Sequence, residues 1–230
     1  MTTPQGARAR ARMEVTAAIK DEARRQLAAE GAAKLSLRAV ARELGMVSSA
    51  LYRYFPSRDD LLTALIIDAY DSLGEAAEAA RAAAGDVAPA QRWVAVCEAV
   101  RRWALAHPHE YALIYGSPVP GYSAPETTIP SAARVALVLI GILREAFERR
   151  GLARTPVPAE LAPEARRMAD ELVPGLPPEV AVAMAAAWAQ LFGLVGFEVF
   201  GQFKGVVEDR DRFFRHAAAQ LAHEVGLVFP

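Results

Sequence analysis

The sequence predicts an all-α fold, with three short helices at the N-terminus followed by a larger antiparallel helical domain. Apolar residues recur at the i, i+3, i+4, i+7 spacing of a helix face along most of the 230 residues. The alternation of apolar and polar residues that marks a half-buried strand never extends beyond a few positions. An apolar content of 53% is ample for a buried core.

Three helices are expected before Pro56. The first ends at Gly31, the second follows Ser36 and ends at Gly45, and the third runs from about Ser48 to Tyr54. The apolar stripe of the first helix is Val15, Ile19, Ala23 and Leu27, and that of the second is Leu37, Val40, Ala41 and Leu44.

A fourth helix is expected to be the mechanical link between the two parts of the chain. Ser57 and Asp60 have the spacing of a capping box, which begins a helix. Its stripe is long enough to pack against the first three helices and against later ones: Leu62, Leu65, Ile66, Ala69, Tyr70 and Leu73.

Breaks rich in Gly and Pro separate the remaining helices. After the break from Gly85 to Pro89, a fifth helix ends near His107 and Pro108, and Gly116 to Pro130 is expected to be a rigid loop. Further helices are expected at Val135 to Leu143, around Glu164 to Leu172 within an irregular region, at Glu179 to Phe203 and at Asp209 to Val225.

Residues 180 to 197 carry no charge and are at the lower length limit of a membrane span. Gln190, the many small residues, Glu179 and Glu198 at the ends and the lack of a second span argue against a membrane segment. A helix that is apolar all round is otherwise buried against the body of the protein and a partner subunit.

A homodimer through the two C-terminal helices is therefore expected, as a four-helix bundle. The last helix contributes Phe214, Ala217, Ala218, Leu221, Val225 and Val228. The glycines of this region either permit close backbone approach or mark a bend: Gly193, Gly196, Gly201 and Gly205.

The net charge of -1 conceals an asymmetry, because residues 1 to 60 hold 11 Lys and Arg against 7 Asp and Glu, while the remainder holds 15 against 20. A basic end suggests a part that meets a polyanion, although coding bias toward Arg is an alternative explanation. Cys97 alone forms neither an internal disulfide nor a zinc site. With no signal-like stretch near Met1, a cytoplasmic protein without metal or other cofactor is expected.

The most informative segment is LSLRAVARELGMVSSALYRYFPSRDDL, from Leu35 to Leu61. Two short helices joined by a tight turn that contains Gly form a helix-turn-helix, whose second helix enters the major groove of DNA. If Leu37, Val40, Val47 and Leu51 point inward, the side chains left outside suit phosphates and base edges: Ser48, Ser49, Tyr52 and Arg53.

From Met13 to Leu65 the sequence resembles the DNA-binding domain of TetR-family regulators, including the LY-x-YFPSR run at Leu51 to Arg58. The family often has His in place of Tyr54 and Lys in place of Arg58, and both replacements still donate to phosphate. The resemblance implies phosphate contacts by Ser36, Arg38, Tyr52, Tyr54 and Arg58, and base contacts by Ser48, Ser49 and Arg53.

Each of these residues also has a structural alternative. Ser36 and Ser57 suit the N-cap position of a helix, and Tyr54 and Phe55 suit the core. Three basic residues near the N-terminus form either a solvated tail or an arm that reaches the minor groove: Arg8, Arg10 and Arg12.

A second segment, RWALAHPHEYALIYGSPVPGYSAP from Arg102 to Pro125, is similar to the C-terminal domain of one TetR branch. The resemblance implies a small-molecule effector, and aromatic residues of this domain suit an apolar cavity. The side chains expected to line it are Trp93, Cys97, Trp103, His107, Tyr111, Tyr115, Tyr122, Phe147, Trp188 and Phe192. His107 and His109 have no further metal ligand at suitable spacing, so no metal is expected.

The sequence thus predicts a DNA-binding domain at residues 1–56 and an effector-binding and dimerisation domain at residues 57–230. We expect a dimeric regulator that binds a palindromic operator and is released by a small, largely apolar effector. The resemblance implies a repressor, because repression is the usual outcome in the family. The sequence has no nucleophile elbow, phosphate loop or metal cluster, which argues against an enzyme. A helical ligand-binding or scaffold protein without operator binding is the alternative.

Overall fold

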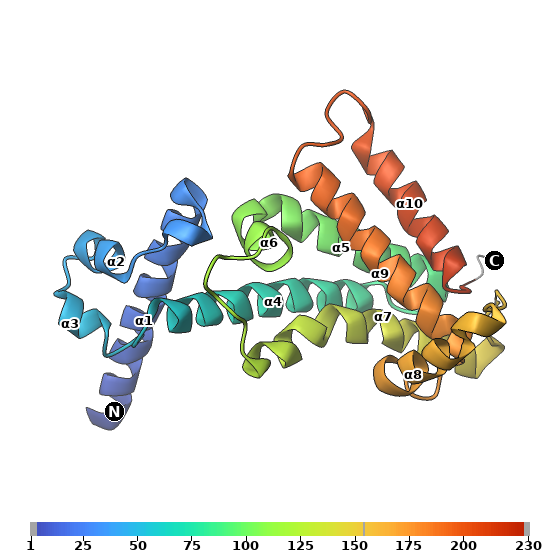
Figure 1. Ribbon diagram of the computed structural model, residues 1–230, viewed down its shortest axis with the longest axis horizontal. Helices are drawn as coiled ribbons and strands as arrows, with labels where there is room; N and C mark the ends of the chain where they lie inside the picture. The colour runs from blue at the N-terminus through green and yellow to red at the C-terminus, as the bar shows by residue number, and fades with distance from the viewer. Residues whose placement is uncertain (1–3, 154, 228–230) are drawn as a thin grey trace. The chain divides into compact units, whose positions relative to one another are not determined.

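The computed structural model describes residues 4–153 and 155–227, whose helices are labelled in Figure 1. Over these residues the chain forms ten α-helices and three short 3-10 helices, and no strand. The predicted all-α fold is confirmed. Val228, expected in the last helix, lies outside the described residues.

The chain divides into two compact units. The N-terminal unit holds the chain up to Tyr70 together with the segment His107–Ile129, and the C-terminal unit holds Asp71–Ala106 and the chain from Pro130 onward. The N-terminal unit contains α1 (Pro4–Glu30), η1 (Ala32–Lys34), α2 (Leu37–Glu43), α3 (Ser48–Leu51), the first half of α4 (Arg58–Ala83), α6 (Pro108–Tyr115) and η2 (Glu126–Thr128).

The core of the N-terminal unit follows the predicted stripes. Ile19 of α1, Val40 of α2 and Leu51 of α3 are fully buried, and Phe55 joins the same core. Side chains from α6 and the loop after it pack against this core, among them Leu113 and Tyr122. The segment 107–129 is therefore part of the same hydrophobic body as α1 to α3.

Two predicted N-caps are confirmed. The Ser36 side chain accepts a hydrogen bond from the Ala39 amide at 3.4 Å, and the Ser57 hydroxyl accepts one from the Asp60 amide at 3.1 Å. Both bonds satisfy amides that the first turn of a helix leaves without a partner.

The third helix is shorter than predicted, since α3 ends at Leu51 and not at Tyr54. The Arg53 and Tyr54 amides donate to carbonyls three residues back, Ala50 and Leu51. This tighter winding is usual at helix ends and precedes Pro56, which cannot continue a helix.

The helix α6 was not predicted, because Pro108 was interpreted only as the stop of the preceding helix. Proline lacks an amide hydrogen, but the first residues of a helix do not need one. Pro108 therefore begins α6 directly after α5 (Pro89–Ala106) ends. The loop predicted from Gly116 to Pro130 is shorter at its far end, because η2 begins at Glu126 and the next helix at Ile129.

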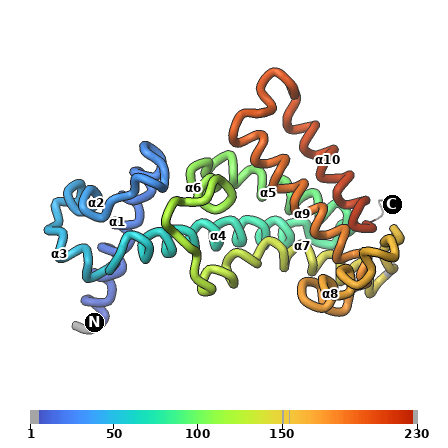
Figure 2. The backbone as a smooth tube through the Cα atoms, viewed as in Figure 1, coloured from blue at the N-terminus to red at the C-terminus, as the bar shows by residue number. Residues whose placement is uncertain are grey.

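The C-terminal unit contains the second half of α4, α5, most of α7 (Ile129–Arg150), η3 (Ala159–Leu161), α8 (Ala162–Leu172), α9 (Pro178–Val199) and α10 (Arg210–Glu224). In Figures 1 and 2, α9 and α10 lie side by side as an antiparallel hairpin. Both helices pack on α5, and Arg101 of α5 binds both carboxylate oxygens of Glu198 at 2.6 and 2.7 Å.

The helix predicted from Glu179 to Phe203 ends earlier, at Val199, because Gly201 adopts φ +81° and turns the chain. Gly201 and Gly205 therefore belong to the turn, whereas Gly193 and Gly196 lie within α9. Residues 126–149 and the helix α9 are each long and apolar enough to cross a membrane by length and composition, a property that core helices of soluble proteins share. Val180, Met184 and Leu191 of α9 are buried inside the unit.

Candidate nucleic-acid interface

The turn between α2 and α3 sets the direction of α3. Gly45 adopts φ +63°, a conformation that glycine takes without the steric penalty of a side chain. The Met46 amide then donates to the Ala41 carbonyl at 2.8 Å, which closes the end of α2. Leu37, Val40 and Leu51 fix both helices on the core, so that the outer face of α3 is held rigidly.

Most of the side chains predicted to meet DNA lie on α3, in the turn that follows it and on α2. Ser48, Ser49 and Arg53 are exposed, Tyr52 is 41% exposed, and Arg38 of α2 is exposed as well. Hydroxyl and guanidinium donors of the helix-turn-helix are therefore accessible to phosphates and base edges.

Val47 was predicted to point inward, and this was wrong, because its side chain is 70% exposed. Val47 occupies the N-cap position of α3 with extended backbone angles, φ −68° and ψ 138°. Helical periodicity does not apply to a residue that precedes the helix. An apolar side chain thus stands beside Ser48 at the start of α3, a feature that sequence reasoning missed.

Three further residues with expected phosphate contacts already have partners within the protein. Ser36 caps α2, and the ring of Tyr54 lies 5.2 Å from the guanidinium carbon of Arg12. Arg58 donates to the backbone carbonyls of Ala32 and Ala33 at 2.9 and 3.3 Å. Arg58 therefore links the start of α4 to η1.

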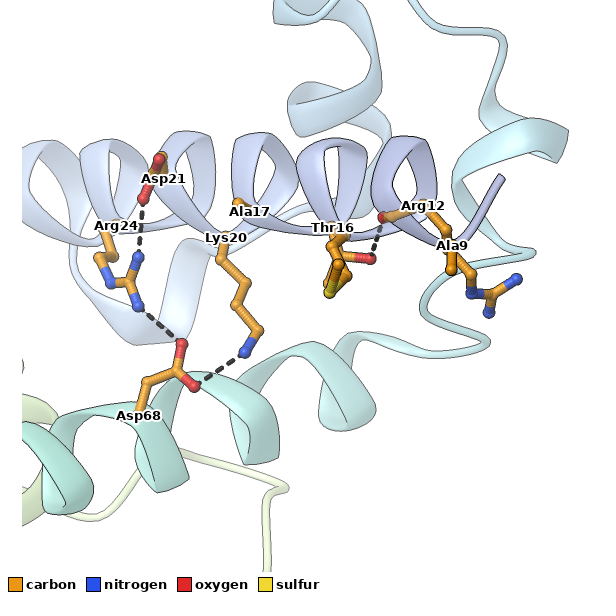
Figure 3. Close-up of a pocket in the computed structure, with 9 residues that line it drawn as sticks. Ala9, Arg12, Thr16, Ala17, Lys20, Asp21, Arg24 and Asp68 are labelled. Carbon is orange, nitrogen blue, oxygen red and sulfur yellow. Dashed lines mark hydrogen bonds and ion pairs between the residues drawn. The ribbon is translucent and has the colours of Figure 1, made fainter. Parts of the chain in front are cut away.

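Charged residues fasten α1 to α4 on the side shown in Figure 3. Asp68 of α4 accepts hydrogen bonds from Lys20 at 2.8 Å and from Arg24 at 2.7 Å. The Arg24 guanidinium also lies 3.2 Å from Glu110 of α6. These bonds hold α1, α4 and α6 in one arrangement beneath the helix-turn-helix.

The ten residues expected to line an effector cavity are divided between the two units. The N-terminal unit holds His107, Tyr111, Tyr115 and Tyr122. The rings of Tyr111 and Tyr115 lie 5.3 Å apart, and the ring of Tyr70 meets Tyr115 edge-on at 6.0 Å. Burial raises the pKa of Tyr111 and Tyr115 above the ordinary range, so both phenols stay uncharged. The Tyr122 hydroxyl bonds that of Thr63 at 2.9 Å.

The C-terminal unit holds the other six residues: Trp93, Cys97, Trp103, Phe147, Trp188 and Phe192. Trp93 and Cys97 lie one turn apart on α5 and are fully buried, and the indole nitrogen of Trp93 has no hydrogen-bond partner. The Trp103 indole donates to the Ser72 hydroxyl at 2.9 Å. Trp188 and Phe192 pack at 4.5 Å on α9, while Phe147 is half-buried.

An apolar groove of about 400 Å³ lies within the N-terminal unit, between the end of α1 and the segment around α6. Sequence reasoning did not find it, because α6 was not predicted. Its lining includes Leu27, Ala32, His109, Leu113 and Val119.

Comparison with known proteins gives a family match for each of two parts of the chain. Residues 19–65 match the family described as "Bacterial regulatory proteins, tetR family", and residues 93–221 match "Tetracyclin repressor-like, C-terminal domain". The chain is 40% identical over 207 residues to the HTH-type transcriptional regulator Rv1816 of Mycobacterium tuberculosis strain H37Rv, which covers 86% of each chain.

Solved structures show the same fold. The regulatory protein SCO4313 superposes with a TM-score of 0.77 at 33% identity, covering 94% of this chain and 98% of the other. RolR, solved in complex with resorcinol, superposes with a TM-score of 0.52 at 16% identity, covering 96% and 98%.

Proposed function

The chain belongs to the TetR family of bacterial transcriptional regulators, and on this premise we propose that it represses transcription as a homodimer on a palindromic operator. A small, largely apolar effector releases the operator. Members of the family regulate transcription through DNA and are not enzymes, so the chain is a DNA-binding regulator without a catalytic role. Its place of action is the cytoplasm, where a bacterial chromosome is found.

The exposed outer face of α3 is the observation that supports operator binding most strongly. In the proposed complex Ser48, Ser49 and Arg53 face bases in the major groove, and Val47 packs against a thymine methyl group. Phosphate contacts come from Ser36, Arg38, Tyr52, Tyr54 and Arg58. Arg58 exchanges its bonds to Ala32 and Ala33 for a phosphate as DNA docks.

Residues 1–56 carry DNA binding in this proposal, and residues 57–230 carry effector binding and dimerisation. Two subunits place their α3 helices in successive major grooves, about 34 to 36 Å apart, which requires a palindromic site. An effector that changes this separation lowers operator affinity by a coupling free energy of about 1 to 3 kcal/mol.

The outer face of α9 supports the dimer. Small and aromatic side chains are exposed there without a charge among them: Ala186, Ala189, Gly193, Phe197 and Phe200. Small residues allow a second helix to approach closely, and the exposed Phe side chains leave water when it does. We place the partner's α9 and α10 against this face, as a four-helix bundle.

The effector is proposed to contact aromatic residues among those predicted to line a cavity. Their uncharged phenols and apolar rings suit a small aromatic or aliphatic molecule. The indole nitrogen of Trp93 is buried without a hydrogen-bond partner, and in the proposed complex it donates to an acceptor on that molecule. RolR, a neighbour in fold, binds the small aromatic resorcinol, which agrees with an effector of this size.

Operator binding is tested with the DNA upstream of the protein's own gene and with a pool of random 30-base-pair duplexes. We expect selection to return a palindrome, and a reporter behind it to be silenced by the wild-type protein and not by Arg53→Ala. Selection of no consensus sequence would rule out the operator, and reporter activation would rule out repression.

A further inference from the structure

The first three turns of α1 extend beyond the body of the N-terminal unit. Every side chain described from Gly6 to Glu14 is exposed, and the first fully buried residue of the helix is Ile19. Packing of apolar side chains therefore does not explain why the chain holds a helix here. Arg8, Arg10 and Arg12 make this segment basic, and Glu14 is its first acidic residue.

Arg12 brings this basic segment to the end of α3. Its guanidinium carbon lies 5.2 Å from the centre of the Tyr54 ring, within the range of a cation–π contact. Figure 3 shows Arg12 on the face of α1 that also carries Lys20 and Arg24. Those two cations are paired with Asp68, whereas among the described residues no carboxylate pairs with Arg12 or Arg8.

Helical spacing separates the three arginines into two faces. Arg8 and Arg12 are four residues apart and share a face, whereas Arg10 is rotated by about 200° from each of them. Arg8 therefore lies on the side of Tyr54, and Arg10 lies on the opposite side of α1.

We infer that Arg8 and Arg12 form a second DNA-contact surface, which binds backbone phosphates flanking the bases that α3 reads. The inference rests on the proposed docking of α3. The chemistry is that of a sequence-independent polyanion site, because guanidinium groups on an exposed helix meet phosphates before they meet base edges. Arg10 takes no part in this surface.

Because the segment is helical, we expect it to bind the backbone phosphates and not to enter the minor groove. A helix with its side chains is about 10 to 12 Å across, whereas the minor groove of B-DNA is about 6 Å wide. The sequence alone allowed an extended arm in the minor groove or a solvated tail. The structure holds Arg8 in the continuous helix α1, so the segment is not an extended arm.

Because phosphates are the same in every sequence, the surface is tested on two 40-base-pair duplexes, one carrying the selected operator and one of random sequence. The salt dependence of binding is measured for wild type, Arg8→Gln, Arg53→Ala and the matched control Arg10→Gln, which removes the same charge from the opposite face of α1.

We expect Arg8→Gln to weaken binding to both duplexes about two- to fivefold and to lower the salt slope by roughly 0.9 for each phosphate that is no longer neutralised. Arg10→Gln should match wild type, and Arg53→Ala should lose affinity for the operator far more than for the random duplex. On an operator trimmed to the bases beneath α3, Arg8→Gln should match wild type.

Equal behaviour of Arg8→Gln and Arg10→Gln on the long duplexes would overturn the phosphate surface, and so would a loss confined to the operator duplex. A wild-type protein without preference for the operator would instead refute the proposed operator binding. The random duplex would still show whether Arg8 contacts phosphates.

Discussion

The Cβ atom of Arg134 lies against the backbone of Gly74, where a methyl group on the glycine would come within 2.7 Å of it. From there Arg134 reaches both carboxylate oxygens of Glu78 at 2.9 and 2.8 Å. The reverse arrangement occurs seven residues further along each helix, where the Arg81 guanidinium of α4 lies over Gly141 of α7. These two crossings join α4 to α7 within the C-terminal unit.

Gly74→Ala and Gly141→Ala should differ in their effect on stability. At Gly74 the new methyl group meets the Cβ of Arg134, which cannot move without the helix, so we expect a loss of about 1 to 3 kcal/mol. At Gly141 it meets the far end of Arg81, which can swing away, so we expect a change within about 1 kcal/mol. Urea unfolding measures both, and equal losses would contradict the close crossing at Gly74.

Arg101→Met should be strongly destabilising. Arg101 binds Glu198, whose side chain is only 5% exposed, and without the guanidinium that carboxylate is left buried and unpaired. Loss of one partner of such a pair costs about 3 to 5 kcal/mol. Arg167→Met removes an ion-paired arginine from the exposed face of α8 and should leave the urea midpoint unchanged. A midpoint for Arg101→Met equal to that control would show that the pair contributes nothing.

Stability should fall as the pH approaches and passes 9.0, the ordinary pKa of a cysteine thiol. Burial raises the pKa of the Cys97 thiol well above its ordinary value of 9.0, so the folded protein keeps a proton that the unfolded chain releases. The unfolded state then binds fewer protons, and the free energy of unfolding decreases by up to about 1.4 kcal/mol per pH unit. Urea unfolding between pH 8 and 9.5 should show a weaker decline for Cys97→Ala, and an identical slope would contradict this origin.

Phe197→Glu should dissociate the proposed dimer. Phe197 is 54% exposed on the outer face of α9, where a carboxylate would have to be desolvated against the partner helix. Leu172→Glu is the matched control, because Leu172 of α8 is also apolar and 54% exposed but lies outside the proposed bundle. Sedimentation velocity should give a monomer for the first and a dimer for the second. A dimer in both would move the interface away from α9.

Helical periodicity and Gly or Pro breaks predicted most of the fold correctly, because burial of one face per helix is a local property of the sequence. They were misleading where one residue can either stop a helix or start one, as at Pro108, which follows the end of α5 and begins α6. Val47 was misplaced for a related reason, since it precedes the first turn of α3 and does not follow its periodicity.

The candidate interface was predictable as far as it depends on α3, where a few consecutive residues decide what is exposed. The bonds of Arg58 were not predictable, because its partners Ala32 and Ala33 precede it by about two dozen residues and only the packed unit brings them together. The contact of Arg12 with Tyr54 is similar, since it requires α1 to be helical about two turns before Ile19, its first fully buried residue.

Operator reading by α3 is tested most directly by the dissociation constant for a random duplex divided by that for the operator, measured on duplexes of equal length at one salt concentration. We expect Arg53→Ala to lower this ratio, because the change removes one bidentate base contact from each half-site. Each such contact contributes about 1 to 3 kcal/mol of discrimination between bases. Arg212→Ala, at an exposed arginine of α10, should leave the ratio unchanged. A ratio unaltered by Arg53→Ala would contradict base reading by this residue, and a wild-type ratio of one would contradict operator recognition itself.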